Sequence, residues 1–421
     1  MAEKVVLAYS GGLDTSVSIR WIKEKYGLDV VTCTVDIGQR EDLSSIGERA
    51  KKIGALAHYQ IDAKEEFAKD YIFKSVKANG MYQGVYPIST ALARPLVAEK
   101  AVDVAKKEGA IAVAHGSTGK GNDQVRFDVT IKGLDPSLRI IAPVREWNLS
   151  RDEEIKYAIK NNIPVKPSKS IYSTDQNLWG RSIEAGPLED PYTEPPEDSF
   201  EWCVPIKKAP EEPQYIELGF EQGIPTALDG KKLSPVELIN QVGFTAGSNG
   251  FGIVDHIEDR LVGIKSREVY ECPAALTIIA AHKDLEKLVL TREELQFKNK
   301  VEEQWSWLVY SGLWIEPLRA DLDAFIDSTQ KRVTGTVRVK LHKGNMRVIG
   351  RKSENALYQH KLSTYDKSST FDQKAAVGFI DIWGMASRVA AQKAVAAASE
   401  GRTNGARKVA PTVKAQPKRK K

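Results

Sequence analysis

A glycine-rich segment near the N-terminus combines residue types that can hold a phosphate group. Residues 8–16 read Ala-Tyr-Ser-Gly-Gly-Leu-Asp-Thr-Ser and follow the apolar run Val5-Val6-Leu7. This order predicts a strand, a sharp turn and a helix, in which glycines and the helix N-terminus present N–H donors to an anion. The segment has neither Gly-x-x-x-x-Gly-Lys-Ser/Thr nor Gly-x-Gly-x-x-Gly spacing. It therefore predicts a polyphosphate site of another type, with an ordinary capped turn as the alternative.

A second glycine-rich segment, residues 115–127, has the groups that an amino acid needs. Its three glycines at 116, 119 and 121 let the backbone approach a ligand. Short polar groups and cations accompany them: Thr118, Lys120, Asn122, Asp123 and Arg126. A zwitterion requires donors for its carboxylate and an acceptor for its ammonium group, and this segment supplies both. The alternative is a solvent-exposed loop.

Two further regions are polar, but neither identifies its chemistry alone. Residues 173–182 are rich in hydroxyl and amide groups, a composition that is common in polar loops. Residues 255–271 carry a run of charges, for which a solvated face is the favoured interpretation. The six histidines are scattered without metal-ligand spacing, and no Gly-x-Ser-x-Gly nucleophile is present. These residues identify no protein metal site, no nucleophile and no general base, and they indicate electrostatic catalysis with Mg²⁺ on a polyphosphate.

Composition and charge limit the class of protein. The chain has 421 residues, of which 42% are hydrophobic, and no apolar run is long enough to cross a membrane. Three cysteines without metal-ligand spacing favour a cytoplasmic location. The net charge is +5, but residues 401–421 contain eight Lys and Arg and no acid, so the rest is mildly acidic. We expect a disordered tail, with nucleic-acid binding as a less favoured alternative.

The first part of the chain alternates between strand and helix patterns. Strands are expected at 4–9, 29–35, 110–114 and 139–143, and helices at 15–26, 43–53 and 91–107, each closed by a glycine (Gly27, Gly54 and Gly109). This alternation predicts an α/β fold with a doubly wound, mostly parallel sheet. Ligands of such sheets bind beyond the carboxyl ends of the strands. We therefore expect the loops 10–16, 35–39 and 115–122 to converge.

The remainder of the chain predicts a second, α+β domain. Residues 185–213 are rich in proline and acids and predict an irregular connector. Expected strands are 215–220, 332–341 and 346–349, with a hairpin at 343–345, and expected helices are 150–163 (with Ser150 and Glu153 as a capping box), 235–242 and 285–311. From Ile380 onward an apolar helical stripe predicts packing on its own domain or on another subunit. The expected units are 1–165, 166–379, 380–400 and the tail 401–421.

Taken together, these motifs resemble the argininosuccinate synthases. Ser-Gly-Gly-x-Asp-Thr/Ser-Ser is the signature of their ATP-pyrophosphatase loop. Further matches are Ile37-Gly38-Gln39, Ala93-Arg94-Pro95, Gly-Lys-Gly-Asn-Asp-Gln-Val-Arg-Phe at 119–127, Glu184-Ala185-Gly186 and Lys265-Ser266-Arg267. The likeness keeps motif order and spacing over about residues 2–385, and the basic tail lies outside it.

The resemblance implies an AMP-forming ligase of arginine biosynthesis and the urea cycle. It implies that citrulline and aspartate are condensed through a citrullyl-adenylate at the expense of ATP with Mg²⁺. It also implies a nucleotide-binding domain at 1–165, a synthetase domain at 166–379 and a homotetramer joined by a C-terminal oligomerisation helix.

The resemblance further assigns site residues by matching position. ATP would contact Ala8, Tyr9, Ser10, Gly11, Gly12, Leu13, Asp14, Thr15, Ser16, Val35 and Gly116. Aspartate would contact Thr118, Asn122 and Asp123. Citrulline would contact Tyr86, Thr90, Asn122, Arg126, Ser173, Ser182, Glu258 and Tyr270. One departure is Ala91, where some members have a serine, so no hydroxyl contact is expected there.

Two other functions compete with this interpretation. Another pyrophosphatase-loop enzyme could adenylate a tRNA base, which the basic tail favours and the acidic body opposes. A non-catalytic nucleotide-binding scaffold is the alternative from a different class, but such a protein would be expected to lose polar groups from a substrate loop, and here all four polar regions are intact.

Overall fold

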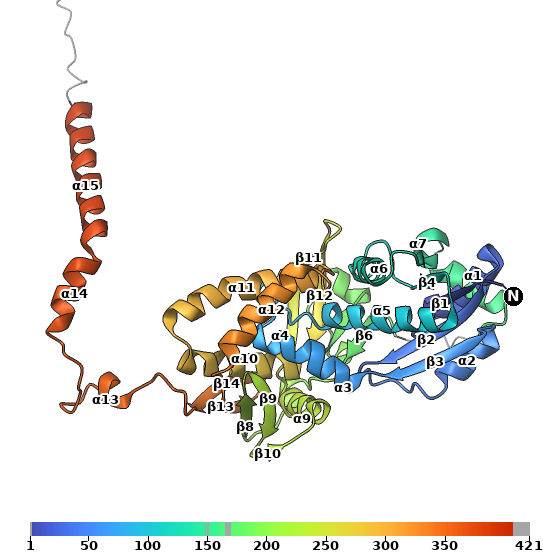
Figure 1. The fold of residues 1–421 in the computed structure, drawn as a ribbon, viewed down its shortest axis with the longest axis horizontal. Coiled ribbons are helices and arrows are strands. Elements are labelled where there is room, and N and C mark those ends of the chain that lie inside the picture. Colours follow the sequence, from blue (N-terminus) through green and yellow to red (C-terminus); the bar gives the residue numbers. More distant parts are fainter. Residues whose placement is uncertain (1, 148, 150, 165–169, 407–421) are drawn as a thin grey trace, which may run out of the picture. The chain divides into compact units, whose positions relative to one another are not determined.

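The structure, a computed structural model, describes residues 2–147, 149, 151–164 and 170–406. The chain divides into two compact units, Met1–Leu357 and Tyr358–Lys421, which we describe separately (Figure 1).

A five-stranded parallel sheet forms the N-terminal part of the larger unit. Its strands are β1 (Lys4–Ala8), β2 (Asp29–Asp36), β3 (Ala57–Asp62), β4 (Ala112–Ala114) and β5 (Arg139–Ile141), in the order β3-β2-β1-β4-β5. All four pairings are parallel, which confirms the predicted sheet. Strand β3 was not expected, because its sequence Ala-His-Tyr-Gln-Ile-Asp is largely polar and occupies a half-exposed sheet edge. The strand order reverses between β1 and β4, the point at which such sheets bind ligands.

Helices cover both faces of this sheet (Figure 1). Val5 and Leu7 of β1 lie in the same core cluster as α1 (Leu13–Tyr26) and α2 (Ile46–Ile53), whereas Val6 lies in the cluster of α5 (Ser89–Glu108). The predicted glycine closures are confirmed: Gly27, Gly54 and Gly109 all take left-handed conformations, with φ of 68°, 117° and 62°. Further helices are α3 (Lys64–Glu66), a π-helical turn (Phe67–Ile72), α4 (Phe73–Lys77), α6 (Asp123–Leu134), α7 (Pro143–Trp147) and α8 (Arg151–Lys160). The expected cap Ser150 lies outside the described residues.

A four-stranded antiparallel sheet corrects two expectations. Its order is β11 (Ile253–Asp259), β12 (Lys265–Glu271), β7 (Gly180–Glu184) and β6 (Ser173–Asn177). The region 173–182 is therefore a hairpin and not an irregular polar loop. Residues 255–271 form two strands whose charges are divided: Asp255 and Lys265 face solvent, as expected, whereas Glu258, Glu268 and Glu271 are buried. Glu271 is fully buried and accepts from Arg181 Nη1 at 2.8 Å and the backbone N–H of Trp202 at 2.7 Å.

A second antiparallel sheet completes the larger unit. Its order is β10 (Lys231–Lys232), β9 (Ile224–Leu228), β8 (Gln214–Glu221), β13 (Gly335–His342) and β14 (Asn345–Lys352). The predicted hairpin is confirmed, with Lys343 and Gly344 both at positive φ as a two-residue turn requires. The residues between 185 and 213 are irregular apart from three short 3₁₀ turns, Gly186–Glu189, Glu197–Ser199 and Ile206–Lys208.

Four helices accompany this sheet: α9 (Pro235–Ser248), α10 (Pro273–Val289), α11 (Arg292–Tyr310) and α12 (Pro317–Gln330). The expected single helix over 285–311 is wrong, because the chain breaks between α10 and α11. Thr291 caps α11 and forms a capping box with Glu294, so two helices replace one.

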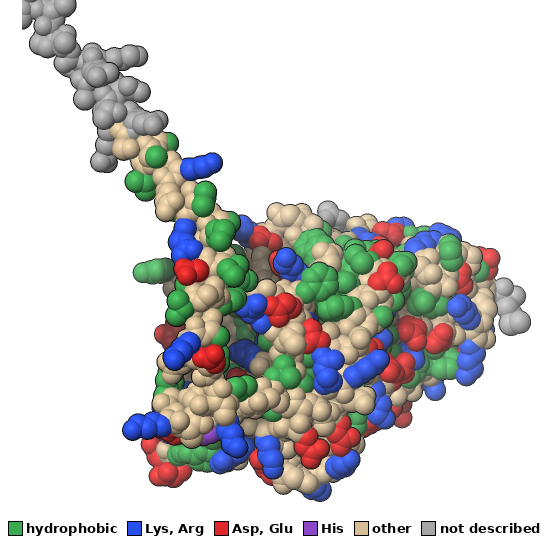
Figure 2. Space-filling model, turned by 60° about the vertical axis from the view of Figure 1, so that its left-hand side comes forward, with side chains coloured by type: hydrophobic (Ala, Val, Ile, Leu, Met, Phe, Trp, Pro, Cys, Tyr) green, Lys and Arg blue, Asp and Glu red, His purple; other side chains and the backbone are tan. Residues whose placement is uncertain are grey.

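The smaller unit contains α13 (His360–Ser363), α14 (Ala375–Trp383) and α15 (Met385–Ala406). The apolar stripe from Ile380 onward is helical, as predicted, but Gly384 interrupts it. Hydrophobic side chains line these helices (Figure 2), and Ile380, Ile382 and Trp383 are all exposed. Residues 407–421 of the basic tail lie outside the described part of the chain. Within the described residues, no helix combines the length and apolarity that a membrane span requires.

Candidate functional site

The turn between β1 and α1 has the geometry of an anion-binding loop. Gly11 has φ +80°, a conformation that favours glycine, and a Cβ there would fit tightly at 3.3 Å from the Ile46 side chain. Ser10 Oγ accepts from Gly12 N at 3.3 Å and shares a hydrogen bond of 3.1 Å with Thr15 Oγ1. Helix α1 begins without a side-chain cap, which leaves its first N–H groups for a ligand. The loop therefore presents backbone donors toward the end of the sheet.

Two groups that the sequence did not single out support this loop. Arg49 of α2 donates from Nη1 to Gly11 O at 2.8 Å, which adds a cation beside the turn. Glu154 of α8 is buried, and this burial together with the charge of Asp14 raises the pKa of Glu154 to about 8. A protonated Glu154 reduces the negative charge that a polyphosphate would meet.

The loops that follow β1, β2 and β4 lie together, as predicted. A Cβ on Gly116 would lie 2.9 Å from Thr15 Cγ2, so the loops after β1 and β4 touch. After β2, Ile37 O accepts from Leu178 N at 2.9 Å, which joins this loop to the turn between β6 and β7. Val35, near the end of β2, is buried. The hairpin β6–β7 of the four-stranded sheet thus closes one side of this edge of the parallel sheet.

A buried histidine shapes the second glycine-rich loop. His115 Nδ1 accepts from Ser117 N at 3.2 Å, so Nε2 carries the proton that bonds Asp128 Oδ1 at 2.7 Å. Arg145 Nη1 donates to the other oxygen of Asp128 at 2.8 Å. These contacts fix the backbone from which Thr118 projects, exposed to solvent.

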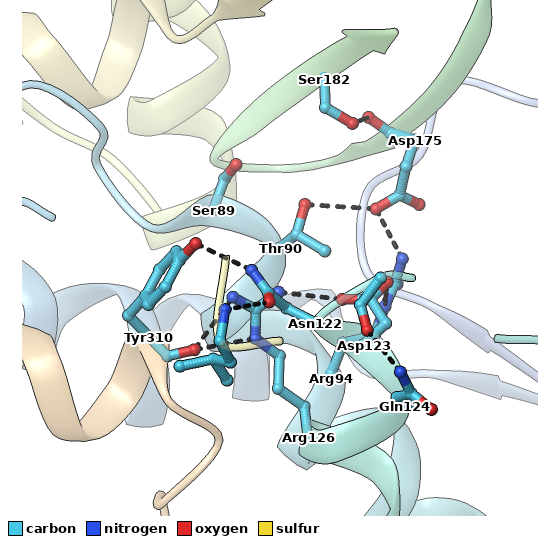
Figure 3. A network of polar contacts seen from close by, with 12 residues as sticks. Ser89, Thr90, Arg94, Asn122, Asp123, Gln124, Arg126, Asp175, Ser182 and Tyr310 are labelled. Atoms are coloured by element: carbon cyan, nitrogen blue, oxygen red, sulfur yellow. Dashed lines mark hydrogen bonds and ion pairs between the residues drawn. The ribbon is translucent and has the colours of Figure 1, made fainter. Parts of the chain in front are cut away.

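A network of charged groups lies beside this loop (Figure 3). Asp123 accepts from Arg94 Nε at 2.7 Å and from Arg126 Nη1 at 2.9 Å. Burial opposes its charge, but the two guanidinium groups hold the pKa of Asp123 below its usual value. Asp175 accepts from Arg94 Nη2 at 2.6 Å and from Thr90 Oγ1 at 3.3 Å. Helices α5 and α6 and strand β6 are thereby joined through two carboxylates.

The network continues from Asn122 to the four-stranded sheet and to Tyr310 of α11. Asn122 Nδ2 donates to Tyr310 Oη at 2.8 Å, and its Oδ1 accepts from Leu261 N at 2.9 Å. Tyr310 and Tyr270 both donate to the carboxylate of Glu258, the latter at 2.6 Å. Burial raises the pKa of Glu258, and these two phenols act against that effect.

An aromatic pair borders Glu258. The rings of Tyr86 and Tyr270 stack with centroids 4.0 Å apart. Tyr86 Oη accepts from Thr90 N at 3.0 Å and shares a hydrogen bond of 3.2 Å with Ser89 Oγ. A buried carboxylate that is bordered by aromatic rings in this way suits an ammonium group.

The structure brings most of the expected amino-acid site together. Connected residues are Tyr86, Thr90, Asn122, Asp123, Arg126, Ser182, Glu258 and Tyr270, with Ser182 Oγ donating to Asp175 O at 3.4 Å. Ser173, exposed on strand β6 and paired with Glu184, and Thr118 have no side-chain hydrogen bond to this network among the described residues. Sequence reasoning missed Arg49 and Tyr310, which carry no motif of their own. It gave Asp175 no role within the polar region 173–182, and it used Arg94 only as part of Ala93-Arg94-Pro95.

In the part of the chain that the structure describes, no cluster of three or more His, Cys, Asp or Glu could hold a metal ion. The groups that this arrangement presents are backbone amides, arginines and carboxylates. The glycine-rich turn after β1 and the loop that leads into the Asp123 network meet where Gly116 lies against Thr15.

Two sequence models of one family match this chain. The arginosuccinate synthase N-terminal HUP domain matches residues 4–164, and the arginosuccinate synthase C-terminal domain matches residues 172–390.

Curated relatives agree with these matches. An argininosuccinate synthase of Pyrococcus furiosus is 60% identical over 387 residues, which cover 92% of this chain and 94% of that protein. Argininosuccinate synthases of Dehalococcoides mccartyi and Bacillus subtilis are 56% and 54% identical, over 93% and 92% of this chain and 97% and 96% of those proteins. A solved structure titled a predicted subunit of tRNA methyltransferase from Methanocaldococcus jannaschii covers 37% of this chain and 75% of that chain at 15% identity with a TM-score of 0.27, and this likeness carries no argument.

Proposed function

Because the chain belongs to the argininosuccinate synthase family, we propose that it condenses L-citrulline with L-aspartate in arginine biosynthesis. The ureido oxygen of citrulline attacks the α-phosphorus of ATP, and pyrophosphate leaves. The aspartate amine then attacks the ureido carbon of the citrullyl-adenylate, loses a proton, and displaces AMP to give argininosuccinate. The observation that supports this proposal is the contact between the two loops at Gly116 and Thr15, because ATP bound on the first loop would then lie beside the amino-acid network.

For ATP, we assign Ala8–Ser16, Val35 and Gly116. Pyrophosphate would rest on the N–H groups at the start of α1, with Arg49 balancing its charge. Mg²⁺ would arrive as the ATP complex, because Mg²⁺ takes most of its ligands from phosphates and water and needs only one or two carboxylates. Asp14, in the first turn of α1, would supply one such carboxylate.

For aspartate, we assign Thr118, Asn122 and Asp123, and for citrulline Tyr86, Thr90, Asn122, Arg126, Ser173, Ser182, Glu258 and Tyr270. The chemistry of these groups suits two amino acids, since two carboxylates can accept ammonium groups and Arg126 can donate to a carboxylate. Bound substrates would replace the ion pair between Arg126 and Asp123: a substrate carboxylate would bind Arg126, and a substrate ammonium group would bind Asp123. Until then, the ion pair keeps both side chains in position. Alignment of three substrates would supply much of the catalysis.

A product assay tests the reaction. ATP labelled on its α-phosphate is incubated with Mg²⁺, citrulline and aspartate, and each is omitted in turn. AMP and argininosuccinate that form only with both amino acids support the proposal. ADP formation, or no turnover with both amino acids present, contradicts it and restores the tRNA-modifying and scaffold alternatives.

We further propose a homotetramer that is joined through the C-terminal helices and works in the cytoplasm. Helix α14 exposes several large apolar side chains, including Phe379, Ile382 and Trp383, and another subunit would cover them from water. Three buried cysteines without a disulfide fit a reducing compartment. Light scattering of the full chain and of a chain ending at Tyr358 tests the assembly. A tetramer in both would show that these helices are not needed.

A further inference from the structure

Tyr310, the last residue of α11, contacts three side chains that we assign to the amino-acid substrates. Its Oη accepts from Asn122 Nδ2 at 2.8 Å and donates to Glu258. Its carbonyl oxygen accepts from Arg126 Nε at 3.2 Å and Nη2 at 3.0 Å. Tyr310 is fully buried, so none of these contacts competes with water.

The hydrogen bonds through the Tyr310 phenol have one direction. An amide N–H only donates and an ionised carboxylate only accepts, so the single phenol proton must point away from Asn122. It lies between Glu258 and the carbonyl of Asp259, which is 3.1 Å from Oη. Tyr270 supplies the second phenol to Glu258, at 2.6 Å. Two phenols therefore orient one carboxylate from two different elements, α11 and β12.

The position of Tyr310 is itself strongly constrained. Its ring stacks on Tyr82 with centroids 3.4 Å apart and planes 6° from parallel. Two residues later Gly312 has φ +75°, and a Cβ there would lie 2.9 Å from Arg126 Cα. The end of α11 is thus pressed against α6, and any other residue at 312 would be both strained and crowded.

We infer that Tyr310 is a positioning residue for citrulline, because its phenol and carbonyl hold Asn122, Glu258 and Arg126 in one arrangement. The inference rests on the proposed function. A substrate ammonium group would bind Glu258 as the carboxylate, and a substrate carboxylate would bind Arg126, so both charged ends depend on the end of α11.

Tyr310→Phe is the direct test, since it removes the phenol oxygen and keeps the ring. Loss of a hydrogen bond to a charged group predicts a rise in KM for citrulline of about tenfold to a hundredfold. The KM for ATP should stay within about twofold, because no phenol contact reaches the phosphate loop.

The pH profile gives a readout that a merely structural role would not move. Removing one of two donors raises the pKa of Glu258, so the acidic limb of kcat/KM for citrulline should move to higher pH. The other titratable and charged groups that face Glu258 are unchanged by this substitution: Tyr82, Tyr86, Arg126, His256, Glu268 and Tyr270.

Tyr71→Phe is the matched control. Tyr71 is also a buried tyrosine, stacked on Trp314 at 4.5 Å, and its Oη donates to Glu99 at 3.1 Å. It should leave both the citrulline KM and the acidic limb unchanged. Thermal unfolding of both variants checks that each protein is folded under the conditions of the assay.

Four results separate the interpretations. An unchanged citrulline KM with an unmoved acidic limb overturns the inference, and so does an equal rise in KM for all three substrates. Calorimetric titration with citrulline keeps the test independent of turnover. If the wild type binds citrulline but makes no argininosuccinate, the proposed function fails, and the ratio of citrulline Kd values in Tyr310→Phe and wild type decides the inference. If the wild type does not bind citrulline, both fail.

Discussion

Substitution of Asp123 tests whether its negative charge contributes to binding of aspartate. It accepts two charge-assisted hydrogen bonds, from Arg94 at 2.7 Å and Arg126 at 2.9 Å. Asp123→Asn keeps the shape but removes the charge that we expect the aspartate ammonium group to meet. Hydrogen bonds to charged groups contribute about 1.5–3 kcal/mol, so kcat/KM for aspartate should fall about tenfold to a hundredfold. Asp123→Ala should abolish condensation.

The assay measures kcat/KM for each substrate with the other two saturating. The loss should be largest for aspartate and smaller for citrulline, because Arg126 keeps the carbonyl of Tyr310 as an acceptor, and smallest for ATP. Asp135→Asn, at the half-buried residue that caps the C-terminus of the same helix, is the control. Equal losses for the three substrates would refute the assignment, since they would indicate a general distortion of α6.

Three further predictions concern other parts of the chain. Because the pKa of Glu154 is raised to about 8, its ionisation at higher pH adds a negative charge beside Asp14. The KM for ATP should therefore rise about threefold or more between pH 7 and 9.5, and Glu154→Gln should abolish this rise. A parallel rise in both proteins would contradict the prediction. Lys298 is fully buried between Glu286 at 2.9 Å and Glu302 at 2.6 Å, so Lys298→Met should lower the free energy of unfolding by about 3–5 kcal/mol in denaturant titrations, while Lys300→Met on the exposed face should change it little. Deleting residues 401–421, which lie beyond the family match ending at 390, should leave turnover unchanged, and a large loss would show that the tail takes part.

Features that depend only on neighbouring residues could be predicted from the sequence. Helix ends at Gly27, Gly54 and Gly109 follow from the left-handed conformation that glycine adopts, and the turn at Lys343-Gly344 follows from hairpin geometry. The same holds for the phosphate loop, because a strand, a glycine turn and a helix are adjacent in sequence. Such features depend on a few neighbouring residues and can be predicted from them.

The four-stranded sheet of β11, β12, β7 and β6 could not be predicted in this way. Strands β7 and β12 carry charged residues such as Arg181 and Glu271, whose burial depends on partners about ninety residues apart. The periodicity of a sequence does not show that two charged residues of distant elements form an ion pair. The charges therefore predicted that these segments are exposed to solvent. Tyr310 was missed for the same reason, since its role comes from residues of α6 and β11 and not from its own neighbours.

The origin of the oxygen that AMP gains tests the central claim most directly. Citrulline labelled with oxygen-18 in its ureido group is converted with ATP, Mg²⁺ and aspartate, and AMP and pyrophosphate are analysed by mass spectrometry. If citrulline is adenylated, the label moves with the displaced group, and the phosphate of AMP should carry it while pyrophosphate stays unlabelled. Unlabelled AMP, or label in pyrophosphate, would contradict attack of citrulline on the α-phosphorus and with it the function proposed for this site.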